Sequence, residues 1–189
     1  MRDRKQAVHR SSNPLSRWGV NPELRRLEGL ASEFRRLILA APIEALPDML
    51  RAFPCCDSLC CSYLLSMFLR EVGFGRIYMV RGTRDGESHV WLETHGLSVD
   101  ITVDQFLEPD IPRGFASEEH PWYQHWTVIE VVDMNFIQID IQKHRRMLDA
   151  YESLVTHGFE RHDAAHPRTV KPPTVVRATA GKPFEPISG

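Results

Sequence analysis

The chain lacks the features that would place it in a membrane or on a secretory route. None of its apolar runs reaches the length that crosses a bilayer, and the apolar stretch at 59–69 is short and begins beside polar residues. The N-terminal segment is basic but contains no apolar core, so it does not resemble a secretory signal. We therefore expect a cytoplasmic protein that does not bind membranes, and export without a cleaved signal stays open.

The chain also lacks an excess of charge of either sign. Its formal net charge is -2 over 189 residues, which gives no general attraction to nucleic acid or to an anionic surface. The hydrophobic fraction of 42% is close to that of globular proteins, so we expect a packed core and no nucleic-acid partner.

Cysteine is scarce, and all four cysteines lie between Cys55 and Cys61. Disulfide frameworks usually close long loops, and this cluster closes none, so we expect a reducing compartment during folding. A zinc site usually needs a second pair of ligands further along the chain, and the sequence has no second cysteine pair. The sequence therefore predicts no metal, and the cysteines are interpreted mainly as small buried side chains.

The remaining pattern predicts an α+β domain. We expect a flexible arm at 1–20, one domain at 21–158 and a proline-rich tail at 159–189. Helical spacing and capping residues predict helices from Pro22 until Pro42, from Asp57 to about Gly73 and from Asp140 to Gly158. Strands are predicted at 76–82, 88–94, 97–102 and 126–133. The helix after Asp57 is apolar nearly all round, so we expect it to be central and to pack on a mainly antiparallel sheet.

A predicted hairpin with His95 and Gly96 in its turn places two polar residues on one face. In this register Trp91 faces Asp100 and His89 faces Thr102, and the aliphatic residues gather on the opposite face. Diagonal neighbours on adjacent strands have Cβ atoms roughly 7–8 Å apart or less, so His89 and Asp100 are within reach of each other. A carboxylate on one imidazole nitrogen leaves the other for proton transfer, although an ordinary surface pair explains the same pattern.

These motifs together resemble bacterial cysteine hydrolases of the papain-like and transglutaminase-like superfamily. The matching pieces cover 53–107: Phe-Pro at 53–54, Ser-Tyr-Leu-Leu at 62–65, Gly73, His-Val-Trp at 89–91, Asp-Ile-Thr at 100–102 and Gln-Phe at 105–106. The resemblance implies the fold of that superfamily, with its catalytic cysteine at position 58, His89 as base and Asp100 as the orienting acid.

This chain departs from the pattern at the nucleophile, because residue 58 is a serine. Three explanations stay open: a cysteine changed to serine to silence the enzyme, a natural serine in a degenerate copy, or a nucleophile shifted to Cys56, Cys60 or Cys61. Among these alternatives Cys61 lies on the same side of the helix as Ser58, whereas Cys60 faces away. A serine hydroxyl does not form the resting ion pair with histidine, so we expect little activity from the sequence as written.

The resemblance implies a cysteine-dependent amide hydrolase or acyltransferase that acts on a peptide or protein and needs no cofactor. It leaves peptidase, deamidase and transglutaminase chemistry open, as well as the oligomeric state. Trp91 and Gln105 are the predicted substrate-binding residues, and an aromatic-rich segment at 118–126 either edges a cleft or packs as an ordinary loop. The rival hypothesis is a non-catalytic module of the same fold that binds a peptide or partner protein.

Overall fold

The predicted α+β class is confirmed by a computed structural model, which describes residues 21–44, 46–137 and 140–165. Within these residues four α-helices accompany a five-stranded antiparallel sheet. The predicted arm at 1–20 and the part of the predicted tail beyond 165 lie outside them. The division of the chain into arm, domain and tail therefore stays a prediction.

The helices begin where the sequence supplies caps. Helix α1 starts after Asn21, whose side-chain oxygen accepts a hydrogen bond from the Glu23 N–H at 3.0 Å, and α2 starts after Asp57, which accepts from the Leu59 N–H at 3.0 Å. The helical segments are α1 Pro22–Ala40, α2 Ser58–Glu71, α3 Pro121–Gln124 and α4 Ile141–Ala165, with 3₁₀ turns at Asp48–Leu50 and Val103–Gln105. The predicted starts of α1 and α2 are confirmed.

Helix α4 is longer than the sequence predicted. We expected it to end at Gly158, but its backbone continues to Ala165. An interior glycine costs about 1 kcal/mol relative to alanine, which a long helix tolerates. The first seven residues of the predicted tail, 159–165, are therefore helical.

The sheet has the order β4-β3-β2-β1-β5, so the predicted hairpin lies at its centre. Its strands are β1 Tyr78–Arg84, β2 Glu87–Thr94, β3 Leu97–Val99, β4 Ala116–Ser117 and β5 Thr127–Asp133. Strand β4 and helix α3 were not predicted from the sequence, since they are only two and four residues long.

The β2–β3 turn confirms the predicted register. His95 and Gly96 both have positive φ, at 52° and 76°, which is the backbone of a two-residue hairpin turn. Thr94 pairs with Leu97 and Leu92 with Val99, as predicted. The ladder ends there, however, so the expected pairs of Trp91 with Asp100 and of His89 with Thr102 are wrong: after Val99 the chain turns away from β2.

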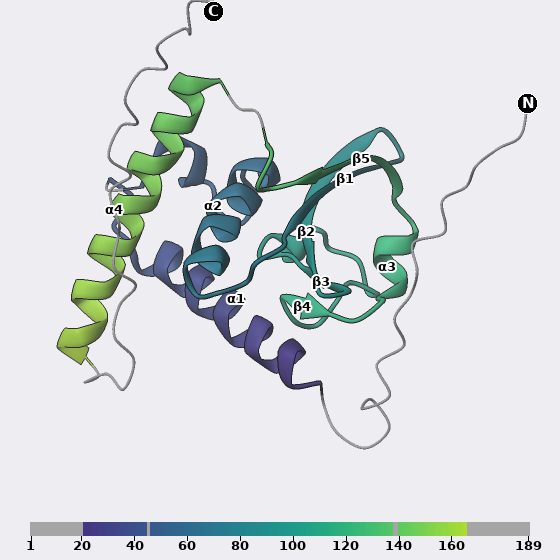
Figure 1. Ribbon diagram of the computed structural model, residues 1–189, viewed down its shortest axis with the longest axis horizontal. Coiled ribbons are helices and arrows are strands. Elements are labelled where there is room, and N and C mark those ends of the chain that lie inside the picture. The colour runs from purple at the N-terminus through teal and green to yellow at the C-terminus, as the bar shows by residue number, and fades with distance from the viewer. Residues whose placement is uncertain (1–20, 45, 138–139, 166–189) are drawn as a thin grey trace, which may run out of the picture.

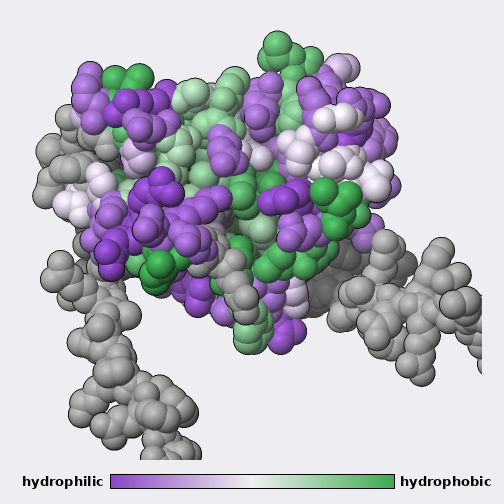
Figure 2. Space-filling view, turned by 90° about the horizontal axis from the view of Figure 1, so that it is seen from above, coloured by the Kyte–Doolittle hydropathy of each residue, from purple (hydrophilic) through white to green (hydrophobic). Residues whose placement is uncertain are grey.

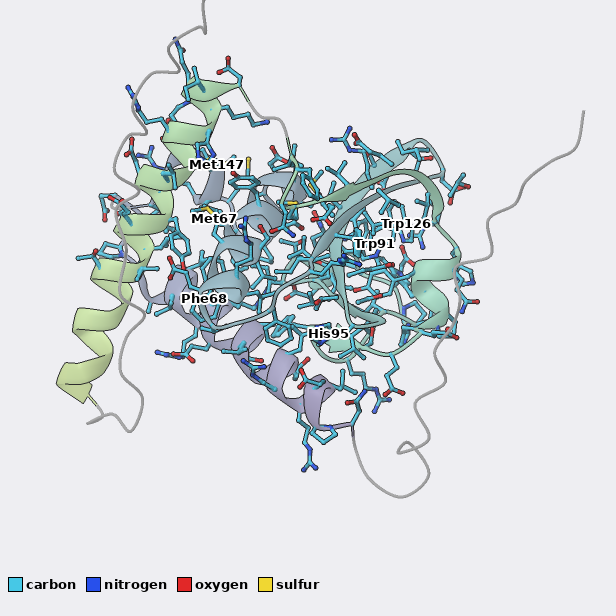
Figure 3. The ribbon with its side chains drawn as sticks, viewed as in Figure 1. Met67, Phe68, Trp91, His95, Trp126 and Met147 are labelled. Atoms are coloured by element: carbon cyan, nitrogen blue, oxygen red, sulfur yellow. The ribbon has the colours of Figure 1, made fainter. Side chains whose placement is uncertain are left out.

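The two faces of the sheet are covered by different elements (Figure 1). Helices α1, α2 and α4 pack on one face, where the predicted aliphatic residues are all buried: Val90, Leu92, Leu97, Val99 and Ile101. Helix α3 and its flanking loops cover the other face, on which Trp91 and Trp126 lie, whereas Phe68 and Met147 lie among the helices (Figure 3). We call these two clusters the helical core and the aromatic cover, the latter made of Val80, Trp91, Val103, Phe106, Trp122, Tyr123 and Trp126.

The edge strand β5 is less covered than the rest of the sheet. Val128, Ile129 and Val131 are each at least half exposed. A space-filling view shows one face of the molecule with hydrophobic residues gathered near its middle and hydrophilic residues on both sides (Figure 2).

None of the helices among the described residues combines the length and apolar character needed to cross a bilayer.

Candidate active site

His89 and Asp100 form a buried hydrogen-bonded pair. The His89 Nε2 and the Asp100 Oδ2 are 2.6 Å apart, and both side chains are 1% exposed. The structure therefore brings together the two residues that the hairpin pattern placed on one face, and it excludes an ordinary surface pair. The contact forms although Asp100 lies one residue beyond the end of β3, because the turn after Val99 keeps its side chain beside β2.

The Asp100 carboxylate is held in one orientation by its own turn. Its Oδ1 accepts hydrogen bonds from the Thr102 backbone N–H at 2.8 Å and from the Thr102 hydroxyl at 2.9 Å. The Asp100 backbone N–H donates to the Phe115 carbonyl at 2.8 Å. Oδ2 is therefore the oxygen directed at the imidazole, and the aspartate fixes the ring's orientation and its tautomer.

Gln105 lies at the other nitrogen of the imidazole. Its side-chain Nε2 is 3.4 Å from His89 Nδ1, and Gln105 itself is half-buried in the 3₁₀ turn Val103–Gln105. When Nε2 carries the proton that binds Asp100, Nδ1 is an acceptor in the neutral ring, and the glutamine amide can donate to it. His89, Asp100 and Gln105 thus form one connected chain of polar contacts.

Arg35 of α1 holds the segment that carries these residues. Its guanidinium donates to the Ile101 carbonyl and to both carboxylate oxygens of Asp104, at 3.0 and 2.6 Å for the latter. The same group lies 4.8 Å from the ring centroids of both Phe53 and Phe115. A bidentate arginine between aromatic rings gives a fixed geometry, so the turn between Asp100 and Gln105 is tied to the helical core.

Ser58 reaches the same strand from the first turn of α2. Its Oγ accepts a hydrogen bond from the Val90 N–H at 3.2 Å, and the Ser62 hydroxyl, one turn further along, donates to the Val90 carbonyl at 3.2 Å. In an antiparallel strand, residues two apart direct their N–H and C=O groups toward the same neighbouring strand. Leu92 pairs with Val99 of β3, so the backbone groups of Val90 are directed to the same side, where β3 has already ended. The two serines therefore take the position of the missing strand partner.

Ser58 thus contacts Val90, the residue next to His89 on β2. The contact is a hydrogen bond with the Val90 backbone rather than with the imidazole. Ser58 is half-buried, so it is the more accessible member of the predicted triad. The N-terminus of α2 adds a partial positive charge at this point, which stabilises negative charge on a side chain there. A cysteine thiolate at this position would gain from that partial charge, whereas a serine hydroxyl stays neutral near pH 7.

Aromatic rings enclose His89 on the face opposite α2. The centroids of Phe106, Trp126, Trp122 and Trp91 lie 4.9, 5.4, 5.9 and 6.1 Å from that of the imidazole. Trp91 is 1% exposed, and its indole nitrogen donates to Glu93 at 3.3 Å. The aromatic-rich segment at 118–126 therefore packs over the histidine. The sequence drew attention to this segment but gave no indication of what it covers.

Arg84 and Glu108 contact the tryptophans on the outer side of the aromatic cover. They form a bidentate ion pair, and the Arg84 guanidinium lies 4.7 Å from the Trp126 ring and 5.5 Å from the Trp122 ring. The Trp122 indole N–H donates to Glu108 at 3.0 Å. The hydrogen bond from Arg84 is the main reason that the pKa of Glu108 lies below its ordinary value. Neither residue was predicted from the sequence, because the two are far apart in the chain and belong to no motif.

The four cysteines have four different environments. Cys55 is exposed, and Cys60 donates to the Asp57 carboxylate at 3.2 Å. Burial, together with that carboxylate, raises the pKa of Cys60 to about 12. The hydrogen bond with Cys56 and burial raise the pKa of Cys61, so neither Cys60 nor Cys61 favours a thiolate. Among the described residues, no group of three or more histidine, cysteine, aspartate or glutamate side chains is arranged to hold a metal ion.

A groove of about 380 Å³ lies on the helical side of the sheet. It is lined from α2, β1, β5 and α4 by residues that include Tyr63, Met79, Arg81, Glu130 and Lys143. Leu59, the neighbour of Ser58, is one of its lining residues, whereas His89 and Asp100 are not. The groove therefore includes the residue next to the predicted nucleophile position and does not include the histidine.

No family model, curated protein or solved structure matches this chain.

Proposed function

We propose that this chain has the papain-like and transglutaminase-like fold and carries the site of a cysteine-type amide hydrolase or acyltransferase, with serine at the nucleophile position. The observation that carries this proposal is the buried His89–Asp100 pair, whose histidine lies on the strand to which Ser58 binds. A central helix packed on an antiparallel sheet, with the nucleophile position in its first turn, supports the same assignment.

In this proposal a thiolate at position 58 attacks the carbonyl carbon of an amide or thioester. His89 accepts the thiol proton and returns it to the leaving group, while Asp100 holds the imidazole. The resulting acyl-enzyme passes to water in a peptidase or deamidase and to an amine in a transglutaminase. The Gln105 amide and the backbone N–H of residue 58 supply donors for the developing oxyanion, since the Leu59 N–H is already bound to the Asp57 carboxylate.

Serine at position 58 makes the chain a poor catalyst in the proposed reaction. Its hydroxyl does not ionise near neutral pH, so the resting ion pair with the imidazole does not form. The aromatic side of His89 is closed and the ring is 1% exposed, so in this proposal a substrate reaches residue 58 at the half-buried start of α2.

The test is the thiol reactivity of Ser58→Cys. Reactive cysteines have pKa values well below the usual 8.5, so we expect iodoacetamide at pH 7 to alkylate residue 58 at least about tenfold faster than an unperturbed thiol. Mass spectrometry of the digested protein identifies which cysteine has reacted. The exposed Cys55 of the same protein is the internal control, because its thiol is more accessible than the half-buried residue 58, so a faster reaction at residue 58 cannot result from exposure.

The proposal also requires that this reactivity depend on His89. Adding His89→Gln to Ser58→Cys should remove the rate advantage, and circular dichroism shows whether the double variant is folded. Asp100→Asn in the same background should weaken it. A Ser58→Cys thiol that reacts no faster than the exposed Cys55 thiol, or one that is indifferent to His89→Gln, contradicts the proposal.

A second candidate is a non-catalytic binding module, and the burial of His89 under four aromatic rings favours it. These rings pack around His89, although one of them, Trp91, is a predicted substrate-binding residue. A bound peptide would instead occupy the groove between α2, β5 and α4, beside the Arg81–Glu130 ion pair. This candidate predicts that peptide binding to the unaltered chain is lost in Met79→Trp, which fills the groove, and is unchanged in His89→Gln.

A further inference from the structure

Two of the four cysteines are in direct contact. The Sγ atoms of Cys56 and Cys61 are 2.9 Å apart, which is about 0.9 Å more than a disulfide bond. The neighbouring thiols do not take part in this contact: Cys60 is directed at Asp57, and Cys55 is exposed. The cluster therefore contains one specific dithiol among four cysteines that are almost adjacent in sequence.

The two sulfurs differ in accessibility and in acidity. Cys56 is half-buried, whereas Cys61 is fully buried in the first turns of α2. The hydrogen bond between the two thiols lowers the pKa of Cys56 and raises that of Cys61. Cys56 is thus the thiol that ionises and meets an oxidant first, and Cys61 is held against it.

The position of the pair indicates a chemical role rather than a stabilising one. Four residues lie between the two cysteines, and a disulfide that closes so short a loop constrains the unfolded chain little. Those four residues include Asp57, which caps α2, and Ser58. A bond between the sulfurs would tie the loop before α2 to the helix and enclose residue 58.

We propose that Cys56 and Cys61 are a redox-active dithiol that a peroxide converts to a disulfide. The Cys56 thiolate attacks one peroxide oxygen, the O–O bond breaks, and Cys56 becomes a sulfenic acid while hydroxide leaves and is protonated to water. The Cys61 sulfur then attacks the Cys56 sulfur, loses its proton and displaces the hydroxyl group as a second water. Two thiols and one hydrogen peroxide give one disulfide and two waters. The oxidation depends on Cys56 and Cys61 alone and does not need catalysis at position 58.

The experiment uses the full chain with Cys55→Ser and Cys60→Ser, which leaves only the proposed pair. The protein is treated with hydrogen peroxide, its remaining thiols are blocked, and it is cleaved before aspartates. Cleavage at Asp57 separates Cys56 in peptide 48–56 from Cys61 in peptide 57–84. We expect the two peptides to stay joined until a reductant is added, while the protein stays monomeric on a non-reducing gel.

Two further variants of this background test the assigned roles. With Cys61→Ser the peroxide should leave Cys56 as a sulfenic acid that dimedone traps. With Cys56→Ser the buried Cys61 should resist both peroxide and dimedone. The second variant replaces a half-buried side chain, so it keeps the test available if Cys61→Ser does not fold.

Three outcomes overturn the proposal. They are separate peptides with independently overoxidised cysteines, a disulfide that forms only between two molecules, and oxidation of Cys61 that does not require Cys56. In the unaltered chain, a preference for a bond involving Cys55 or Cys60 overturns it too. Since none of these readouts uses Ser58 or His89, a failure here is distinct from a failure of the proposed function.

Discussion

One face of the sheet packs against three long helices, whereas the other packs against a loop, a short helix and a few aromatic rings. The helical core is largely aliphatic and draws buried residues from three helices and three strands. The aromatic cover is much smaller, and it encloses the imidazole of His89. The burial that holds the fold together is thus mostly separate from the packing that holds the candidate site.

This separation has a physical reason. Aliphatic side chains pack in many ways at similar cost, so they suit a large core. Aromatic rings have preferred relative orientations and few rotatable bonds, so they hold a neighbouring ring in a narrower range of positions. A histidine that must keep one nitrogen on a carboxylate is better fixed by the second kind of packing. We infer that a substitution in the helical core changes stability more than site geometry, and that one in the cover does the reverse.

The largest effect is expected in the helical core. Leu92→Ala removes a fully buried side chain next to α2, and the resulting cavity should lower the free energy of unfolding by about 2–5 kcal/mol. Urea unfolding followed by circular dichroism measures this change. Imidazole nitrogen shifts in the NMR spectrum should still report a His89 ring bound to Asp100, because Leu92 points to the opposite face.

Val131→Ala on β5 is the control for this experiment. Val131 is 57% exposed, so its truncation should change the free energy of unfolding by less than about 0.5 kcal/mol. A loss for Leu92→Ala no larger than for Val131→Ala would show that the helical core does not carry the stability. A changed His89 spectrum in Leu92→Ala would show that the two faces are coupled.

The helical core could be predicted from the sequence because its pattern is periodic. The register that places His95 and Gly96 in the turn also sorts Val90, Leu92 and Val99 onto one face, and the structure buries all three there. Asp57 and Asn21 mark helix starts by a local mechanism, a side-chain oxygen that accepts from the backbone. The end of α4 could not be predicted in the same way, since Gly158 is permitted but not required to end a helix.

The candidate site was predicted only in part, because many of its residues lie in loops whose sequence has no helical or strand periodicity. The contact between His89 and Asp100 followed from the alternation of side chains, although the ladder stops before Asp100. The packing of Trp122 and Trp126 over His89 depends on the path of the 103–126 segment, which has no period to read. The contact between the Cys56 and Cys61 sulfurs depends on side-chain rotamers in a loop and a helix start.

A smaller effect is expected at the close approach beneath the aromatic cover. Gly82 pairs with His89, and a Cβ atom added there would lie 2.9 Å from the Trp126 Cβ and 3.0 Å from the Trp91 ring. The Trp126 Cβ is fixed to its backbone and cannot swing aside, so Gly82→Ala should cost about 1–3 kcal/mol. Its signature should be a changed near-ultraviolet circular dichroism spectrum and tryptophan fluorescence, together with a shifted His89 imidazole resonance.

Gly29→Ala provides the matched comparison. An added Cβ at Gly29, inside α1, meets no atom within 4 Å, so this variant should gain up to about 1 kcal/mol from helix propensity. Its tryptophan signals should be unchanged. If Gly82→Ala lowers stability but leaves the tryptophan and histidine signals as they are, the cover does not set the geometry of His89.

The smallest effect is expected at the outer edge of the cover, where it depends on pH. The hydrogen bond from Arg84 keeps the pKa of Glu108 in the folded chain below its ordinary value of 4.5. A carboxyl with a depressed folded pKa stabilises the fold fully above its unfolded pKa, and that contribution is lost as the pH falls below 4.5 through the folded value. Glu108→Gln should therefore be less stable than the unaltered chain at pH 7, and the difference should shrink at pH 3. Because both partners are partly exposed, we expect a modest difference that high salt reduces further.

Asp48→Asn makes the same charge change at a side chain that is 89% exposed beside Arg51, so it corrects for net charge. A difference between Glu108→Gln and the unaltered chain that stays constant from pH 7 to pH 3 would mean that packing of the side chain, rather than its charge, fastens the cover over Trp122.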